Sequence, residues 1–311
     1  MLSIPSFMSI ASLYEIYLRR CFTAAGLLSQ SIAVDDETTI HFWGPTSKSP
    51  NKACLVLIHG FGPMAIWQWR KQVQFFAPHF NVYVPDLVFF GGSTTRSSER
   101  SEKFQAAAVV KLVEKEVVAD EESKKKKVHV IGTSYGGFVA YQVARMMGVE
   151  RVGKVVIASS GVNMRKKDNL ALLERAGLER IEDLMMPAKP QHFRKLMALS
   201  LSRRLHYLPD FFLADFINKL YSDNRKEKME LLKGVSLGRE EALNISPLQQ
   251  EVLIVWGEHD RIFPVQMARE LREVIGKKAS LEVIKDASHV PQIEKAAEFN
   301  NIILNFLKGC T

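Results

Sequence analysis

A serine, a histidine and an aspartate stand where they could form a nucleophilic catalytic site. Ser134 lies in the segment Gly132-Thr133-Ser134-Tyr135-Gly136, between the apolar run Val128–Ile131 and a segment with helical spacing. In a strand–turn–helix context, a sharp turn projects the hydroxyl out of the sheet edge, and glycines are needed where neighbouring side chains would collide. The helix points backbone N–H groups and its positive dipole end at a developing oxyanion. The pattern predicts that Ser134 is the nucleophile.

A histidine is expected as the base, because a serine hydroxyl is a poor nucleophile until a neighbouring group takes its proton. His289 lies just past the last predicted strand, in a loop that can reach back over the sheet edge to the serine. The other histidines fall where packing, turn or surface roles are expected: His41, His59, His79, His129, His192, His206 and His259. We therefore predict that His289 is the general base.

An acid should hold the histidine in the correct tautomer and stabilise the imidazolium. Asp260 follows the predicted strand Val252–Trp256, and the chain order Ser, Asp, His suits a nucleophile on such a turn. Glu258 and Asp286 are the alternatives, although Asp286 would approach from the wrong side of the histidine loop. The sequence predicts a triad of Ser134, Asp260 and His289.

Two backbone N–H groups are expected to bind the oxyanion. One belongs to Tyr135, the residue after the nucleophile. The other should come from the loop His59–Pro63, which follows an apolar strand. Phe61 is the natural donor in this loop because Gly60 and Gly62 let the chain come close, while His59 is expected to be structural.

Short apolar runs alternate with helical segments from residue 31 onward, which predicts βαβ units and a mostly parallel eight-stranded sheet flanked by helices. The predicted strands are Ser31–Val34, Thr39–Trp43, Ala53–Ile58, Asn81–Pro85, Val128–Gly132, Lys154–Ser159, Val252–Trp256 and Leu281–Ile284. The predicted helices include 102–118, 136–147, 264–275 and 291–307.

One stretch, residues 163–248, has no convincing strand and is predicted to be a helical cap or lid inserted into a core of 31–162 and 249–311. An insertion after a strand's carboxyl end lies where open α/β sheets bind ligands. Phe193, Met197 and Phe212 are predicted to line an apolar substrate pocket there, together with Leu201, Phe211 and Phe216. The alternative is that these side chains pack the inserted helices on each other.

The first 30 residues are expected to form a helical segment. Residues 1–14 carry no charged side chain, and apolar residues recur at helical spacing, but the run is shorter than a spanning helix needs. Packing against the domain is the first interpretation. Peripheral membrane contact through residues 1–20 is the second.

Composition narrows the partners. The 311 residues carry a net charge of +8, but the longest basic run, Lys124–Lys127, lacks the interleaved aromatic residues of a single-strand binder, so no nucleic-acid partner is expected. Three cysteines without CxxC spacing argue against disulfides and zinc and indicate a reducing, cytoplasmic location. We expect no metal and no cofactor. The sequence gives no oligomeric state.

These motifs together resemble the α/β-hydrolase superfamily: the segment 132–137, the loop 59–62, Pro85-Asp86 with Gly91-Gly92-Ser93, the segment 257–260 and Ser288-His289. The resemblance covers roughly residues 31–308 apart from the insertion. It is greatest to the lid-bearing esterase, lipase and carbon–carbon-bond hydrolase branch and to plant members, the latter through 67–70 and 84–92. The run Val88-Phe89-Phe90 departs from the glycine pattern of relatives and is expected to alter the pocket.

The resemblance implies a serine hydrolase, since members that open epoxides or remove halides use an aspartate in place of Ser134. We expect an apolar small-molecule ester, such as a lipid ester, to be cleaved through an acyl-enzyme. A carbon–carbon-bond hydrolase with the same triad is one alternative. It would need cationic groups for an acidic substrate, and the sequence leaves open whether Arg70 or Arg203 faces the pocket. A small-ligand, hormone-like receptor on this scaffold is another.

Overall fold

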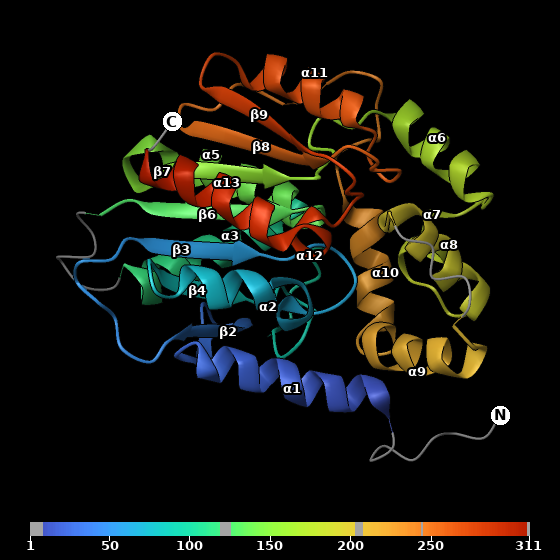
Figure 1. Ribbon diagram of the computed structural model, residues 1–311, viewed down its shortest axis with the longest axis horizontal. Helices are drawn as coiled ribbons and strands as arrows, with labels where there is room; N and C mark the ends of the chain where they lie inside the picture. The colour runs from blue at the N-terminus through green and yellow to red at the C-terminus, as the bar shows by residue number, and fades with distance from the viewer. Residues whose placement is uncertain (1–8, 119–125, 203–207, 244, 310–311) are drawn as a thin grey trace.

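The structure is a computed structural model that describes residues 9–118, 126–202, 208–243 and 245–309. A central sheet has helices on both faces (Figure 1). Eight strands cross it in the order β1-β2-β4-β3-β6-β7-β8-β9. The pairs β1–β2 and β2–β4 are antiparallel, and all later neighbours are parallel. The predicted mostly parallel sheet flanked by helices is confirmed.

Every predicted strand is present, with ends shifted by a few residues. The strands are β1 (Leu27–Ala33), β2 (Thr38–Pro45), β3 (Cys54–Ile58), β4 (Asn81–Pro85), β5 (Thr94–Thr95), β6 (Val128–Thr133), β7 (Val152–Ala158), β8 (Glu251–Gly257) and β9 (Ala279–Ile284). The sequence missed only β5, which pairs with β2 and is too short to show any periodicity. β3 and β4 are buried at every position because helices cover both of their faces.

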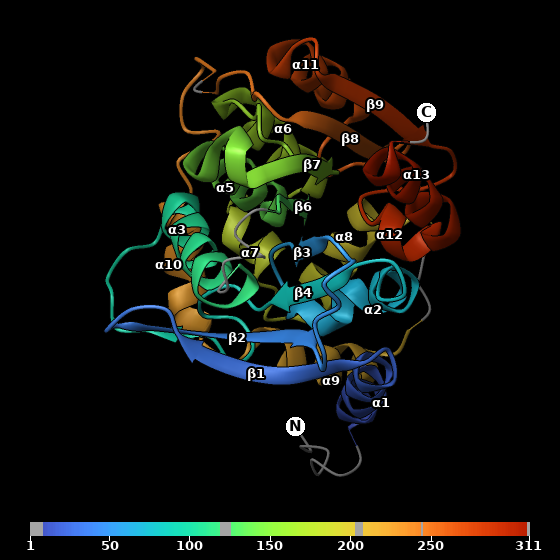
Figure 2. The ribbon, with the colours of Figure 1, turned by 90° about the vertical axis from the view of Figure 1, so that its left-hand side faces the viewer.

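Two hydrophobic cores lie on opposite faces of the sheet. One face packs against α1 (Ile10–Ala24), α2 (Ala65–Phe76) and α13 (Ala296–Lys308). The other packs against α3 (Glu102–Leu112), α5 (Tyr135–Arg151) and α11 (Val265–Ile275). α3 continues into one π-helical segment, η2 (Val113–Val117), and the short α12 (Pro291–Glu294) precedes α13. Figure 2 shows the two helical layers on either side of the strands.

The described residues between β7 and β8 form five helices, which we call the inserted helices. They are α6 (Lys166–Ala176), α7 (Ile181–Met185), α8 (Pro190–Ser200), α9 (Asp210–Tyr221) and α10 (Arg225–Gly234). No strand occurs among the described residues of this stretch. The group lies to the right of the sheet in Figure 1, beyond the end of β3.

The N-terminal segment differs in part from the prediction. Helix α1 begins at Ile10 and ends at Ala24, and β1 already begins at Leu27, so residues 27–30 are strand rather than helix. Leu18 and Phe22 of α1 are fully buried, which agrees with packing against the domain. Residues 1–8 of the predicted segment lie outside the described residues. Within the described ranges, no helix has the length and apolar character needed to cross a membrane.

Candidate active site

Ser134 occupies a strained turn between β6 and α5. Its φ of 52° lies in the left-handed region, which non-glycine residues rarely adopt. A Cβ atom at Gly132 would lie 2.1 Å from the carbonyl oxygen of Gly136, and one at Gly136 would lie 2.3 Å from that of Ile58. Ser160 Oγ donates to the Ser134 carbonyl oxygen at 2.6 Å, which helps to hold the turn. Gly132 and Gly136 are therefore needed for the close packing of the chain around Ser134.

The side chains of the three predicted triad residues form a continuous chain of hydrogen bonds. The Ser134 hydroxyl lies 2.9 Å from Nε2 of His289, and Nδ1 of His289 lies 2.9 Å from Oδ2 of Asp260. Oδ1 of Asp260 accepts from the backbone N–H groups of Ile262 and Phe263, at 2.8 and 2.9 Å. Because both carboxylate oxygens are engaged, the buried Asp260 side chain has a fixed orientation toward His289.

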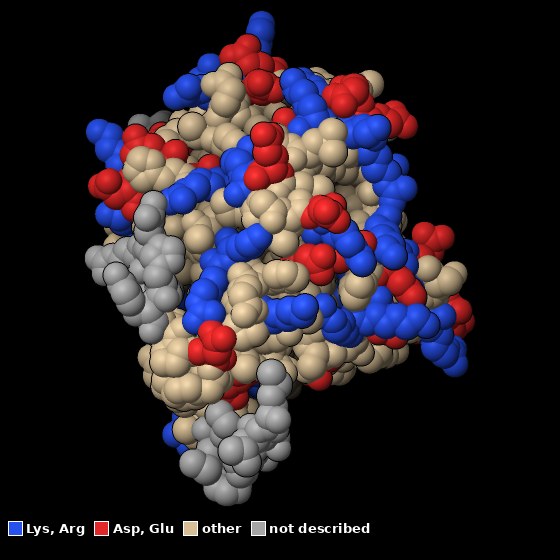
Figure 3. Space-filling model, turned by 90° about the vertical axis from the view of Figure 1, so that its right-hand side faces the viewer, with Lys and Arg blue, Asp and Glu red and all other residues tan. Residues whose placement is uncertain are grey.

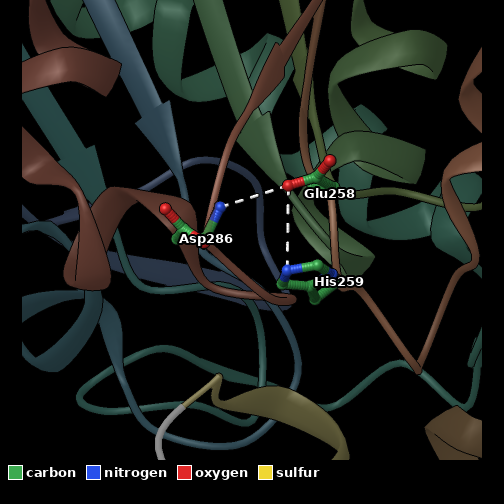
Figure 4. Close-up of side chains that lie close together, drawn as sticks. All are labelled: Glu258, His259 and Asp286. Atoms are coloured by element: carbon green, nitrogen blue, oxygen red, sulfur yellow. Dashed lines mark hydrogen bonds and ion pairs between the residues drawn. The ribbon is translucent and has the colours of Figure 1, made fainter.

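The alternative acids lie at the surface. Glu258 and Asp286 are exposed, as is His259 between the strand end and the triad acid (Figure 4). Glu258 Oε2 lies 3.7 Å from Nε2 of His259 and accepts the Asp286 backbone N–H at 3.4 Å. Among the described residues, these three form the only group whose ligand atoms gather closely enough to suggest a metal. These residues are exposed and contact one another, as is ordinary in a surface loop, and we assign them no metal.

The two predicted oxyanion donors lie on neighbouring loops. Ile58 and Gly132 are register partners in β3 and β6, so the segments that follow these strands emerge side by side. The rings of Phe61 and Tyr135 pack edge to face, with centroids 5.7 Å apart. Within the described part of the chain, neither backbone N–H donates to another protein group. Both donors are therefore available to a ligand at Ser134.

The half-buried Gln68 and the buried His59 support the loop that carries one of these donors. Gln68 Oε1 accepts from the Gly60 N–H at 2.8 Å, and its Nε2 donates to the Pro63 carbonyl oxygen at 2.8 Å. His59 Nδ1 lies 2.7 Å from the Gly60 carbonyl oxygen, and its Nε2 accepts the Leu87 N–H at 2.9 Å. This bonding pattern requires neutral imidazole, and burial lowers the pKa of His59 in agreement. The geometry is consistent with the structural role expected for His59.

A second buried pair supports the same region and was not predicted. Asp86 accepts the backbone N–H of Ala65 at 3.0 Å, and its other oxygen lies 2.8 Å from His41 Nδ1. Burial alone would raise the pKa of Asp86, but the hydrogen bond and charge of His41 outweigh it and lower the pKa. A side chain at Gly91 would collide with the Asp86 carboxylate. The pair fixes the start of α2 next to the site.

Glu294 links the inserted helices to the histidine loop. One of its carboxylate oxygens accepts from both the backbone N–H and the hydroxyl of Ser202, at 2.8 and 2.6 Å. The other accepts the backbone N–H of Ser288, the neighbour of His289, at 2.7 Å. The Ser288 hydroxyl also lies 3.2 Å from the carbonyl oxygen of Leu199 in α8. The end of α8 and the position of His289 are therefore coupled. Sequence reasoning missed Glu294, because the partner that joins it to the inserted helices, Ser202, is distant in the chain.

A cavity of about 520 Å³ opens at Ser134. Its wall is mainly apolar and comes from the core loops, α6, α7 and α10. The apolar lining comprises Phe61, Tyr135, Phe138, Met164, Leu172, Leu173, Ile181, Met185, Leu232, Val235, Leu237, Ile262 and Phe263. The charged lining comprises Glu179, Arg180, Glu182, Lys233 and Arg239. An apolar pocket with charged groups at part of its wall suits an amphiphilic ligand.

The predicted pocket residues on α8 and α9 lie outside the cavity at Ser134. None of Phe193, Met197 and Phe212 belongs to the cavity lining. Phe193 is buried against Tyr221, with ring centroids 5.9 Å apart, and Met197 packs against the core. The Phe212 ring lies 4.2 Å from that of Phe211. Phe193 therefore packs α8 on α9, which is the alternative that the sequence left open.

Other side chains that the sequence raised for the pocket also lie outside the cavity lining. Phe89 and Phe90 do not line the cavity. The Phe90 ring packs edge to face against that of Phe61, with centroids 5.3 Å apart. Arg70 instead donates to the hydroxyl of Tyr17 at the surface. Residues 203–207, which include Arg203, lie outside the described residues, as does part of the basic run 124–127.

Comparison with known proteins identifies a family. The family model described as alpha/beta hydrolase fold matches residues 54–296. A 2-hydroxy-6-oxononadienedioate/2-hydroxy-6-oxononatrienedioate hydrolase of Dechloromonas aromatica is 26% identical over 187 residues, which are 58% of this chain. The match spans 62% of that relative, less than two thirds of its length.

Solved structures share the fold. A bacterial membrane phospholipase A superposes with a TM-score of 0.77 and 22% identity, over 97% of this chain and 91% of that one. A 2-hydroxy-6-oxo-6-phenylhexa-2,4-dienoate hydrolase from Rhodococcus sp. strain RHA1 gives a TM-score of 0.72 and 22% identity, over 91% and 99%. These relatives are bacterial and give no support to the expected resemblance to plant members.

Proposed function

The chain belongs to the α/β-hydrolase family, and from that premise we propose that it is a serine hydrolase that cleaves carboxylic esters with a largely apolar acyl group. The observation that supports this proposal most directly is the chain of hydrogen bonds from Ser134 through His289 to Asp260. It joins a nucleophile to a base and a base to an orienting acid, which is the arrangement that acyl transfer requires.

In the proposed reaction, Ser134 Oγ attacks the ester carbonyl carbon while His289 Nε2 takes its proton. The N–H groups of Phe61 and Tyr135 stabilise the negative charge on the carbonyl oxygen. The intermediate collapses, the carbon–oxygen bond to the alcohol breaks, and His289 returns the proton to the departing alcohol. Water then attacks the acyl-enzyme with His289 again as base, releasing the acid and restoring the Ser134 hydroxyl. These steps need no cofactor.

The cavity supports an apolar acyl group, including that of a lipid ester. Its volume of about 520 Å³ is sufficient for a medium-sized ligand, and apolar side chains form most of its wall. We further propose that residues 163–248 act as a lid on a core of 31–162 and 249–311. In support, α6, α7 and α10 contribute much of the wall opposite Ser134.

A carbon–carbon-bond hydrolase is the second candidate. The cations Arg180, Lys233 and Arg239 line the cavity and would suit a substrate carboxylate. The relatives from Dechloromonas aromatica and Rhodococcus are named for such dienoate and dienedioate substrates. The same triad would then act on a ketone next to the bond that breaks. Arg180→Ala and Lys233→Ala should impair turnover of a 2-hydroxy-6-oxo-dienoate in this case and leave neutral esters largely unaffected.

The test is turnover of p-nitrophenyl esters of increasing acyl length by the wild-type protein and Ser134→Ala. We expect kcat/KM to fall by about 10⁴-fold or more in the variant. Labelling by a fluorophosphonate probe should be lost in parallel. The exposed Ser98 provides a matched control, and Ser98→Ala should retain both properties.

Two outcomes would contradict the proposal. In the first, Ser134→Ala turns over esters as fast as the wild type. In the second, the folded wild type neither turns over any ester nor reacts with the probe. Turnover of a dienoate with no ester turnover, combined with probe labelling at Ser134, would instead select the second candidate.

A further inference from the structure

Two neighbouring helices expose apolar side chains at one end of the molecule. Helices α1 and α9 lie side by side in both ribbon views (Figures 1 and 2). Six side chains on them, each 40–57% exposed, form what we call the α1–α9 apolar surface: Ile10, Leu13, Tyr14, Ile16, Tyr17 and Phe211. They are half of the twelve large apolar side chains exposed in the described part of the chain. Single exposed apolar residues are ordinary, but such a concentration marks an interaction surface.

The two helices form one rigid unit. Asp215 of α9 accepts the backbone N–H of Ala11 at 2.9 Å, at the positive end of the α1 dipole. Lys219 of α9 pairs with the buried Glu15 of α1 at 2.8 Å. Phe211 lies one turn before Asp215 on the same side of α9 and therefore borders the start of α1. The apolar surface thus extends across both helices rather than along a loose tail.

The charges around this surface are complementary to an anionic partner. Arg20 is exposed on α1, and Arg70 donates to the hydroxyl of Tyr17 at 2.9 Å. The nearby carboxylates of Glu15, Asp210 and Asp215 are already engaged, that of Asp210 by Arg194. In Figure 3 the described atoms at the lower left of the face that bears the inserted helices are mostly tan, and Lys and Arg side chains lie above them.

The chemistry of the surface favours a lipid rather than a protein partner. An interfacial helix combines apolar side chains, Tyr at the polar boundary and flanking Lys or Arg. The α1 helix has all three on its exposed side, and the sequence before it, residues 1–9, is also uncharged. We propose that the α1–α9 apolar surface docks the protein on an anionic lipid surface. This inference does not depend on the proposed function.

The test is co-sedimentation of the full chain with vesicles of phosphatidylcholine containing about one fifth phosphatidylserine. The variant Leu13→Glu/Ile16→Glu should bind these vesicles at least about tenfold more weakly, because two apolar contacts are lost and two negative charges are added. Leu170→Glu is a matched control, because Leu170 is 58% and Leu13 57% exposed on different helices. It should bind like the wild type.

A separate variant tests the expected preference for anionic lipid. Arg20→Gln should weaken binding to phosphatidylserine vesicles about fivefold and leave the weak binding to pure phosphatidylcholine unchanged. It also tests the proposal if the double variant does not fold, which thermal unfolding of each variant will reveal.

Three results would overturn the proposal. In the first, the wild type does not sediment with vesicles. In the second, Leu170→Glu loses vesicle binding as strongly as the double variant. In the third, vesicle binding is absent and light scattering shows a dimer that Leu13→Glu/Ile16→Glu dissociates. The last would assign the surface to a second copy of the chain. Ester turnover without vesicles, measured on the same variants, separates a failure of docking from a failure of the catalytic proposal.

Discussion

Ser202, two residues beyond helix α8, and Ser288, beside His289, are bound by the same carboxylate, that of Glu294. All three hydrogen atoms in these contacts belong to Ser202 or Ser288, so both carboxylate oxygens act as acceptors. A group in this position cannot be replaced by an amide without placing an NH₂ donor against another donor.

Glu294→Gln should therefore loosen both the end of α8 and the histidine loop. We expect the free energy of unfolding to fall by about 2 kcal/mol, the range for hydrogen bonds to a charged group. The kcat for ester turnover should fall more than KM rises, because the position of His289 is disturbed. Urea unfolding and steady-state kinetics measure the two effects.

The exposed Glu298, only four residues away on α13, gives a matched control. Glu298→Gln should leave both stability and kcat unchanged within error. Equal effects of the two substitutions would show that the Glu294 contacts do not position His289.

Asp260→Asn should abolish most activity for a reason specific to this site. The backbone N–H groups of Ile262 and Phe263 require an acceptor, so the amide oxygen will stay with them. The NH₂ group then faces Nδ1 of His289 and forces that nitrogen to accept. The proton moves to Nε2, which can no longer take one from Ser134. We expect kcat to fall by about 10⁴-fold with little loss of stability.

Glu258→Gln and Asp286→Asn are the controls for this change, because both residues are exposed and lie in the same loops. Their kcat should remain within about twofold of the wild type, since surface changes away from the reacting groups have small effects. A large loss in either variant, with activity retained in Asp260→Asn, would move the role of the acid to that residue.

His129 should make the protein less stable in mild acid. Burial and the charge of Lys154 lower the pKa of His129 to about 4, and its Nδ1 accepts the Lys154 backbone N–H at 3.2 Å. The folded state therefore keeps His129 neutral, while the unfolded state takes up a proton below about pH 6.5. The unfolded state binds more protons across this window, so stability is lost as the pH falls from about 6.5 toward 4.

The free energy of unfolding lost because of His129 should be about 2 kcal/mol. This is less than the full value that the pKa shift implies, because the ring is partly exposed. Urea unfolding at several pH values will measure it. His129→Leu should flatten the dependence of stability on pH in this window, whatever its effect on stability at neutral pH. An unchanged slope in the variant would be incompatible with a neutral, half-buried His129 in the folded state.

Leu172→Trp should shorten the acyl chain that the protein prefers, because Leu172 lines the cavity and the larger ring takes up part of its volume. The optimum in the p-nitrophenyl ester series measures the change. Phe193→Ala is the control outside the cavity. It should lower stability by about 3 kcal/mol or more without moving the chain-length optimum. A shifted optimum in Phe193→Ala would place that ring in the substrate pocket after all.

The sheet was predictable because buried parallel strands appear in the sequence as continuous apolar runs. Val252–Trp256 and Asn81–Pro85 have this form, and the structure places strands there. The turn around Ser134 was predictable because it requires glycines for a local steric reason: side chains at Gly132 and Gly136 would collide with neighbouring backbone. Strand ends and the two-residue β5 were less accessible, since pairing partners rather than local sequence decide them.

The cavity was not predictable from the spacing of apolar residues. Helical periodicity identifies the apolar side of a helix but does not show whether that side faces another helix or a cavity. Phe193 and Leu172 both lie on apolar sides, yet Phe193 packs on Tyr221 while Leu172 lines the cavity. The contacts of Glu294 and of Asp86 with His41 were equally inaccessible, because each joins segments far apart in the chain.

The attachment of α1 has a practical consequence for producing the protein. A shortened chain beginning after Ala24 would lose Leu18 and Phe22 from the core, and the ring of Trp43, now 5.2 Å from Phe22, would face water. Lys219 of α9 would also lose its partner on α1. Removing the N-terminal helix should therefore yield protein that aggregates.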